Sequence, residues 1–171
     1  MDKKQQRAII IGLLHWLKES GSWCGETHIQ KALYCLKDLE KVPTKYDFII
    51  YKHGPFSFDL RDELVAMRGD GLLSITPYPY GVSFNITERG DNFYSETGRK
   101  YEKSIKHIAK FFGSKGVAAL ERLSTALFIK VKNPDKNTDE LTSLICKIKP
   151  HIKSEQAKQA LESIDYYLTR N

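Results

Sequence analysis

Apolar residues recur at intervals of three and four through the first forty positions, which is the spacing of helices with one buried face. The first set predicts a helix over about residues 4–20, ended by Gly21, and consists of Ile10, Leu13, Leu14 and Leu17. The second set predicts another helix and consists of Ile29, Leu33, Leu36 and Leu39. We expect this second helix to begin at Thr27, because Thr27 and Gln30 have the spacing of a capping box, in which each side chain satisfies a free backbone N–H.

The pattern then changes to a short run of β-forming residues. Residues 46–51 are rich in such residues and predict a strand. Gly54 and Pro55 follow and are expected to turn the chain into a third helix. Ser57 is the expected N-cap of that helix, and its inner face is expected to consist of Leu60, Leu64 and Met67.

Two further β-prone runs, residues 72–76 and 82–86, flank a turn with two prolines and predict a β-hairpin. Two helices, a strand, a third helix and a hairpin follow one another in the order of a winged helix-turn-helix domain, whose hairpin is the wing. We therefore expect residues 1–90 to form such a domain. Domains of this kind bind DNA or other proteins and seldom catalyse reactions, so the functional question is what this one binds.

Residues 91–171 carry only helical patterns. A long helix is expected over residues 91–112, with an inner side formed by Tyr94, Tyr101, Ile105, Ile108 and Phe112. Two or three further helices follow, with joints at Asn133–Pro134 and Pro150. The expected fold class is mainly α with a small β-sheet, a winged helix-turn-helix plus a C-terminal helical extension. The extension is expected either to pack on the winged domain or to form the interface of a homodimer.

Charge, cysteine content and hydropathy narrow the picture. The 171 residues carry a net charge of +6, but residues 1–90 contain 12 Lys and Arg against 11 Asp and Glu, a net of +1, and residues 91–171 contain 15 against 10, a net of +5. The basic excess therefore lies outside the expected winged domain. Three cysteines without a Cys-x-x-Cys pair indicate a reducing compartment, so a cytoplasmic protein is expected. The longest apolar run, residues 8–14, is far shorter than the roughly 20 residues that span a bilayer, so no membrane association is expected.

Two short motifs carry a resemblance to a known family. Residues 29–34, Ile-Gln-Lys-Ala-Leu-Tyr, precede residues 51–57, Tyr-Lys-His-Gly-Pro-Phe-Ser. Together they resemble the YwgA-like winged-helix family and the related SocA-like (Panacea) antitoxin-type domains, although Ala32 stands where leucine or isoleucine is commoner. The motif positions with a structural role in such a family are Lys31, Tyr34, His53, Gly54, Pro55 and Ser57. The helical tail from Leu120 to Leu168 also resembles the end of YwgA-like proteins. The resemblance implies a non-enzymatic protein with an antitoxin-like or adaptor-like role and a partner such as a toxin or a protease component.

The third helix is poorly suited to reading DNA. A recognition helix needs cationic and amide side chains, whereas this one carries Asp59, Asp62 and Glu63 against Arg61 and Arg68. The wing segment, residues 72–86, contains no Lys or Arg to contact phosphates. We therefore expect a regulatory protein that docks to another protein. The expected docking residues are the three carboxylates of this helix together with Tyr78 and Tyr80 on the wing turn, whose rings could instead fold back on the sheet.

A DNA-binding regulator is the alternative function. Its phosphate contacts would come from basic residues of the helix after residue 90, namely Arg99, Lys103, Lys106, Lys110 and Lys115. The same residues could equally form an ordinary solvated helix face. The two functions differ in which charges matter: the basic set for DNA, and the acidic third helix for a protein.

Motifs for chemistry are weak throughout. Cys24, His28 and Cys35 could share one side of a helix, but Cys24 precedes the helix and a fourth ligand is not evident, so no metal is expected. His53 could act as a general base, yet no nucleophile with an orienting partner is visible, and a hydrogen-bonded turn histidine is the more ordinary interpretation. Phosphate-binding glycine motifs are missing from the sequence. We therefore expect no catalytic residues, no enzymatic activity and no cofactor.

Overall fold

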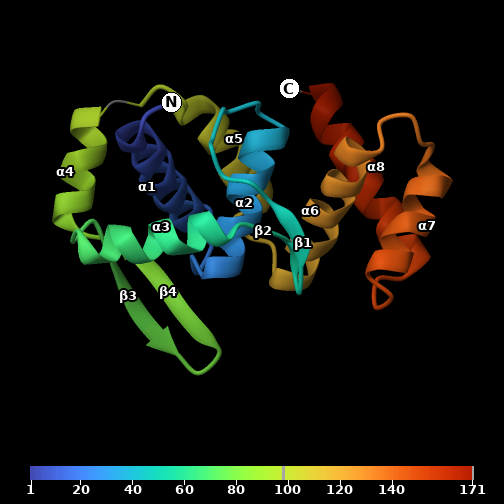
Figure 1. The fold of residues 1–171 in the computed structure, drawn as a ribbon, viewed down its shortest axis with the longest axis horizontal. Helices are drawn as coiled ribbons and strands as arrows, with labels where there is room; N and C mark the ends of the chain where they lie inside the picture. Colours follow the sequence, from blue (N-terminus) through green and yellow to red (C-terminus); the bar gives the residue numbers. More distant parts are fainter. Residues whose placement is uncertain (98, 171) are drawn as a thin grey trace.

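The computed structural model describes residues 1–97 and 99–170. It confirms the expected fold class, mainly α with a small amount of antiparallel β-sheet (Figure 1). In chain order the elements are α1 (Lys3–Glu19), α2 (Glu26–Asp38), β1 (Ile49–Tyr51), β2 (Gly54–Phe56), α3 (Phe58–Gly69), β3 (Leu73–Tyr78), β4 (Gly81–Ile86), α4 (Glu88–Thr97), α5 (Glu102–Phe112), α6 (Val117–Lys132), α7 (Thr138–Ile148) and α8 (Ser154–Arg170).

The first two helices form where the apolar pattern predicts them, and their apolar residues are buried. The predicted capping box at Thr27 is wrong, since α2 begins at Glu26 after Gly25, which makes no side-chain cap bond. The amide of Gln30 instead accepts from the Ser57 backbone N–H at 2.9 Å and donates to the Ser57 carbonyl at 2.9 Å. Two hydrogen bonds to buried backbone groups outweigh one exposed bond at a helix end, because unpaired polar groups are costly only when buried.

The segment around Gly54 and Pro55 differs from the prediction. Only residues 49–51 of the expected strand are extended and paired, and Gly54 and Pro55 do not break the sheet but form its second strand, β2. Lys52 and His53 make the two-residue turn between the strands. Gly54 has φ +89, which a residue with a side chain rarely adopts, and it allows the chain to reverse here. Ser57 then caps α3 as expected, accepting from the Leu60 N–H at 3.3 Å.

The predicted hairpin is confirmed and is longer than expected. Strands β3 and β4 pair from Leu73↔Ile86 to Tyr78↔Gly81 around a turn at Pro79–Tyr80. The hairpin extends away from the helices in Figure 1. The outer edge of β4 is covered by the segment before α2, because the Phe84 N–H donates to the Cys24 carbonyl at 3.0 Å and Gly25 bridges Ser83.

The long helix predicted over residues 91–112 is wrong: two helices, α4 and α5, occupy this region. Helix α4 packs on α1 and β4, whereas α5 packs on α1 and α2. A straight helix of that length would span about 33 Å and could not follow this change of neighbours. The break falls beside Gly98 in the sequence, a residue type that weakens helix interiors. Gly98 itself lies outside the described residues.

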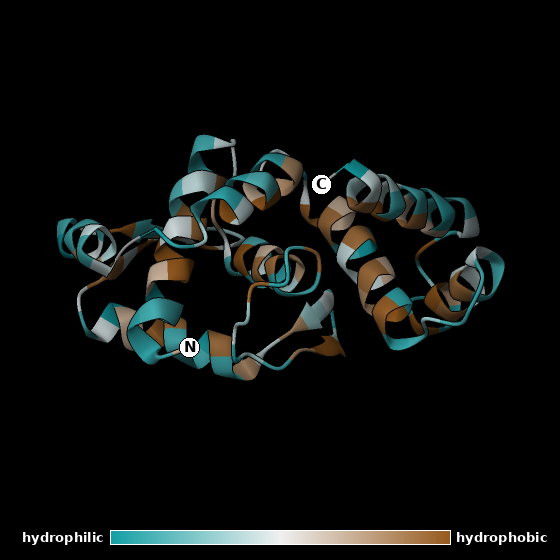
Figure 2. Cartoon of the chain, turned by 90° about the horizontal axis from the view of Figure 1, so that it is seen from above, coloured by the Kyte–Doolittle hydropathy of each residue, from teal (hydrophilic) through white to brown (hydrophobic). Residues whose placement is uncertain are grey.

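Three further helices complete the chain, with joints near Asn133–Pro134 and Pro150 as expected. Helix α6 packs on α2 and β2, and it also contacts α7 and α8, which lie at the far end of the molecule (Figure 1). In Figure 2 the outer sides of these helices are largely hydrophilic and the sides turned toward one another are more hydrophobic. The apolar faces of α5 and α6 are therefore used within the chain.

Candidate functional site

Two buried lysines hold the β1–β2 hairpin. The Lys31 side chain, on α2, is 1% exposed, and its Nζ donates to the Pro55 carbonyl at 2.8 Å. Lys149, just after α7, is also buried, and its Nζ donates to the carbonyls of Tyr51 at 2.7 Å and Lys52 at 2.6 Å. Both strands are thus bound by ammonium groups that come from helices far apart in the sequence.

The carboxylate of Glu121, on α6, supplies the opposite charge. It is buried, and its Oε1 lies 3.1 Å from Lys149 Nζ and 3.2 Å from His151 Nε2. Its Oε2 lies 3.9 Å from Nδ1 of His53 in the hairpin turn. Burial lowers the pKa of Lys31 to about 8, and the Glu121 charge offsets part of that shift. We name Lys31, Glu121 and Lys149 the ion cluster.

Gly54 places the hairpin directly on α6. A Cβ at Gly54 would lie 3.0 Å from Thr125 Oγ1 and 3.2 Å from Ser124 Oγ, closer than ordinary packing allows. With the Gln30–Ser57 bonds and the ion cluster, this contact fixes the hairpin at several independent points. Four of the six positions that carry the resemblance to YwgA-like proteins take part in these contacts around the β1–β2 hairpin: Lys31, Gly54, Pro55 and Ser57.

The other two motif positions lie apart from these contacts. The Tyr34 ring is buried, with its centroid 5.2 Å from that of Phe48 and 5.8 Å from that of Phe128. His53 is exposed in the turn. Of the described residues, none provides a nucleophile bonded to His53, whose recorded charged neighbour is Glu121.

The β1–β2 hairpin and the first residue of α3 present aromatic rings to solvent. The side chains of Tyr51, Phe56 and Phe58 form a triangle, with ring centroids 5.5 Å (Tyr51–Phe56), 5.6 Å (Tyr51–Phe58) and 5.1 Å (Phe56–Phe58) apart. Tyr51 is 52% exposed and Phe58 is 40% exposed. Large rings at such exposure, gathered at one place, are unusual on a surface that makes no contacts.

The outward side of α3 continues this surface. The exposed side of α3 carries Phe58, Arg61, Asp62 and Val65. Phe58 is three and four residues before Arg61 and Asp62, and Val65 is four and three residues after them, so all four lie on one side of the helix. Arg61 lies over the Phe58 ring, 5.1 Å from its centroid, and pairs with Asp62 at 3.2 Å. The charges on this side are therefore balanced. We name this apolar set the aromatic face. It consists of the exposed Ile49, Tyr51, Phe58 and Val65 together with Phe56, which is partly buried.

The predicted acidic docking residues do not form one surface. Glu63 is half-buried and engaged within the molecule, at 2.6 Å from Arg7 Nε and 3.8 Å from Lys3 Nζ. Asp62 is exposed and paired with Arg61, and Asp59 is exposed with no ion pair among the described residues. The sequence analysis missed the aromatic face beside them. The sequence signal for this face is the group of aromatic residues at positions 51, 56 and 58 on both sides of Gly54–Pro55.

The two predicted tyrosines of the β3–β4 turn lie together. Tyr78 and Tyr80 stack at 6.0 Å between centroids, and Trp23 meets Tyr78 at 6.1 Å and Tyr80 at 5.5 Å. Tyr80 is still 78% exposed. Trp23, which the sequence analysis did not single out, supports a second and smaller aromatic group at the tip of the hairpin.

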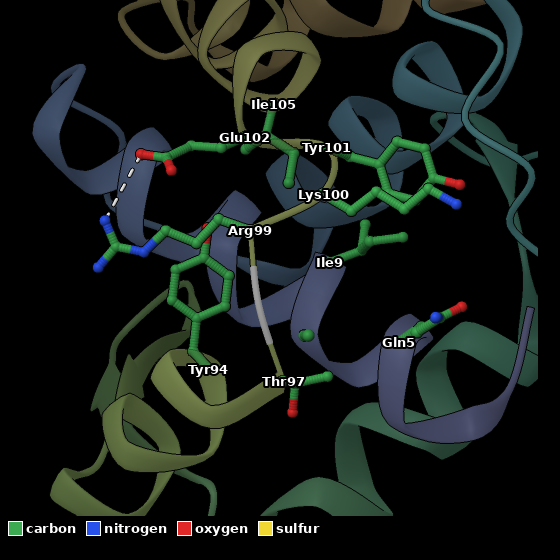
Figure 3. A pocket seen from close by; sticks show the side chains of 10 residues that line it. Gln5, Ile9, Tyr94, Thr97, Arg99, Lys100, Tyr101, Glu102 and Ile105 are labelled. Carbon is green, nitrogen blue, oxygen red and sulfur yellow. Dashed lines mark ion pairs between the residues drawn. The ribbon is translucent and has the colours of Figure 1, made fainter.

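The five predicted basic residues are not on one helix, because Arg99 precedes α5 and Lys115 follows it. Arg99 lies beside the Tyr94 ring and 3.8 Å from Glu102, in the wall of a cavity of about 40 Å³ (Figure 3). That volume suits one or two water molecules. Lys106 lies 2.9 Å from Glu102. Only Lys103 and Lys110 project from α5 without an ion pair among the described residues.

Residues 1–97 and 99–170 contain neither a cluster of side chains that could hold a metal ion nor a helix that could span a membrane. The three cysteines are free, and Cys24, His28 and Cys35 are buried without forming a group that could hold a metal ion. None of the described helices combines the length and the apolar character needed to cross a bilayer. No model of a known protein family matches the chain, and no curated protein matches it.

Proposed function

We propose that this chain is a non-enzymatic winged-helix protein that docks to another protein through the aromatic face. The observation that carries the proposal is the ring triangle of Tyr51, Phe56 and Phe58, formed by a hairpin that buried charges hold in place and by the first residue of α3. Tyr51 and Phe58 are its exposed members. The order of α1 to β4 supports the winged-helix interpretation. The resemblance to SocA-like domains favours an antitoxin-like or adaptor-like role, with a toxin or a protease component as the partner.

Energetics favour a protein partner at this surface. Aromatic and arginine side chains supply most of the binding energy at protein interfaces, where they are withdrawn from water. A rigid support adds affinity, because side chains that are already ordered lose little entropy on binding. The hairpin is held by α2, by α6 and by the residue that follows α7, so the rings of the aromatic face keep their positions without a partner.

The charges around the aromatic face also favour a protein partner over DNA. On the elements that carry the aromatic face, the Arg61–Asp62 pair is neutral, and the exposed Lys52 and Asp59 have opposite charges. Phosphate neutralisation dominates the affinity of DNA-binding proteins, and this side of the molecule offers little of it. A partner surface with a matching apolar patch and few charges fits the aromatic face best.

A quantitative pull-down tests the proposal. The purified chain and the double variant Tyr51→Ala/Phe58→Ala serve as baits in a lysate of the source cells, and a protein that the original chain captures is then purified and titrated. We expect the double variant to lose at least about 30-fold in affinity, which corresponds to about 2 kcal/mol for removed interface anchors.

Tyr166→Ala is the matched control, since Tyr166 is an aromatic residue of α8 that is exposed to a similar degree. It should bind like the unchanged protein. Equal binding by all three proteins would contradict the proposal.

DNA binding is the second candidate function. It is favoured by the net charge of +5 in residues 91–171 and by the unpaired Lys103 and Lys110 on α5. The test is a titration with random-sequence duplex DNA at about 50 and 200 mM salt, repeated with Lys103, Lys106 and Lys110 changed to Glu. Tight binding that is lost with salt and with the triple change would replace docking by DNA binding, whereas no binding at low salt removes this candidate.

A further inference from the structure

A pocket of about 200 Å³ lies between α6 and α8, which we name the α6–α8 pocket. The two helices pack against each other in the C-terminal part of the chain (Figure 1). Ala119 of α6 and Ala160 of α8 both line the pocket. Alanine side chains are too short to fill the space between two packed helices, so a hollow remains beside them.

Two cationic side chains line this pocket, Lys115 just before α6 and Arg122 on α6. Both are partly buried. The recorded neighbour of the Lys115 ammonium is the Phe111 ring, 5.3 Å from its centroid. The guanidinium of Arg122 has no hydrogen bond or ion pair with any residue that the structure describes. Its five N–H donors are therefore available to a ligand.

The neutral groups of the pocket add a donor. Gln156 accepts the Lys153 N–H through its Oε1 at 3.1 Å, which leaves its amide N–H groups without a partner in the described chain. The Ser163 hydroxyl is not free to donate, because it donates to the Gln159 carbonyl at 2.7 Å. None of the described side chains that line the pocket is acidic. The pocket therefore combines two positive charges and an amide donor without a carboxylate to neutralise them.

The basic residues predicted to contact phosphates are placed differently. Of those five, only Lys115 lines the α6–α8 pocket. Arg99 and Lys106 lie 3.8 Å and 2.9 Å from Glu102, which offsets part of their charge. The strongest anion-binding arrangement in this half of the chain is therefore built around Arg122.

We propose that the α6–α8 pocket binds the dianion of a phosphate monoester. Arg122 and Lys115 pair with its oxygens, and Gln156 donates a further hydrogen bond. A phosphate monoester carries a charge of about −1.5 to −2 at pH 7, which matches two cations, whereas a carboxylate or a phosphodiester carries a single negative charge. Guanidinium groups suit phosphate in particular, because two of their N–H groups can bind it in parallel.

The size of the pocket limits what it encloses. Sites that surround a drug-sized ligand measure roughly 300–1,000 Å³. The α6–α8 pocket, at about 200 Å³, holds the phosphate group and the few atoms next to it. Gln159 at the pocket is exposed, so the rest of the ligand extends into solvent. The same dianion is carried by small phosphorylated molecules and by phosphorylated side chains of proteins.

A nuclear magnetic resonance titration of the full chain with O-phosphoserine tests the site, at about 50 mM salt to limit screening. We expect a dissociation constant between about 0.1 and 1 mM, with shifts of the Arg122 and Gln156 side-chain signals. Dimethyl phosphate, a diester, should bind at least about tenfold more weakly. Unshifted side-chain signals, or equal affinity for the two ligands, overturn the proposal.

Charge-neutralising variants test the residues. Arg122→Gln and Lys115→Gln should each weaken O-phosphoserine binding at least about tenfold, and circular dichroism checks that each is folded. Arg68→Gln is the matched control, because Arg68 of α3 is exposed, has no ion pair among residues 1–97 and 99–170, and loses the same charge. It should bind like the unchanged protein. Equal weakening in Arg68→Gln would mean general attraction of an anion and overturns the site.

A Gly-Ser peptide with one phosphoserine distinguishes the two sources of the phosphate. Tighter binding than O-phosphoserine, lost without the phosphate, assigns the pocket to phosphorylated proteins, and equal binding assigns it to small molecules. Duplex DNA that displaces O-phosphoserine overturns the proposal in favour of a nucleic-acid backbone. Tyr51→Ala/Phe58→Ala should bind O-phosphoserine unchanged, so the result is independent of docking through the aromatic face.

Discussion

The two hairpins of this protein are held in opposite ways. Strands β1 and β2 have three residues each and are fixed by Lys31, Lys149 and the contact of Gly54 with α6. Strands β3 and β4 have six residues each, and no strand of residues 1–97 and 99–170 pairs with the outer side of β3. A two-stranded hairpin is marginally stable by itself, and a three-residue one is weaker still.

The difference shows which hairpin depends on the rest of the molecule for its stability. The short hairpin exists because side chains from distant helices satisfy its carbonyls, so its position is set by the helical body. The long hairpin satisfies its inward backbone groups through its own pairing, and the segment before α2 covers only the outer edge of β4. We therefore expect the short hairpin to be rigid and to suit a fixed docking face.

Removing the charge at Glu121 should cause the largest loss of stability, because it weakens the support of the short hairpin. In Glu121→Gln two buried lysines lose their buried counter-charge, and deleting one member of a buried ion pair costs about 3–5 kcal/mol. The measurement is urea denaturation at neutral pH.

Asp165→Ala is the control, because Asp165 pairs with Lys130 at 2.7 Å but is partly exposed, so its loss should cost less than about 1 kcal/mol. Equal costs for the two variants would mean that the ion cluster does not stabilise the fold.

Raising the pH should test the burial of Lys31. Its pKa is lowered to about 8 in the folded protein from an ordinary value of 10.5, so between these values the unfolded chain binds more protons. Stability at this site therefore rises with pH across that window, by about 1–2 kcal/mol between pH 8 and 9.5.

The measurement is the difference in unfolding free energy between the unchanged protein and Lys31→Met at several pH values. The variant lacks the titrating group, so the difference should grow with pH. A difference that stays constant from pH 8 to 9.5 would place the Lys31 ammonium in a solvated environment.

Changes at the outer edge of β3 should have the smallest effect on stability. Ser74→Lys/Thr76→Lys alters exposed side chains of the long hairpin and should change the unfolding free energy by no more than about 0.5 kcal/mol. Thermal unfolding measures it. A cost above 1 kcal/mol would show that β3 is held by its surroundings as tightly as β1 and β2.

Much of the fold could be predicted because its signals are local. The apolar spacing in α1, the Ser57 cap and the residues flanking Pro79–Tyr80 act within a few positions of one another. The missed features depend on contacts between distant segments. Gln30 fits a capping box by spacing, but it binds Ser57, 27 residues later.

The candidate site was predicted only in part for the same reason. Tyr78 and Tyr80 stand out as aromatics in a turn, whereas the aromatic face appears only when the hairpin brings Tyr51 beside Phe58. Glu121 carries no sequence signal at all, since one glutamate in a helical pattern looks like any surface residue. Its role comes from the lysines and histidines that the fold gathers around it.

The hydrogen bonds between Lys149 and the β1–β2 hairpin also determine when this hairpin can be stabilised during synthesis. The Lys149 ammonium binds carbonyls 98 and 97 residues earlier in the chain, so the ribosome must synthesise the chain as far as Lys149 before this support of β1 and β2 can form. Contacts of such long sequence separation form late, because the intervening chain must first be ordered. A nascent or truncated chain that ends before Lys149 therefore lacks one of the supports of the hairpin that carries Tyr51 and Phe56.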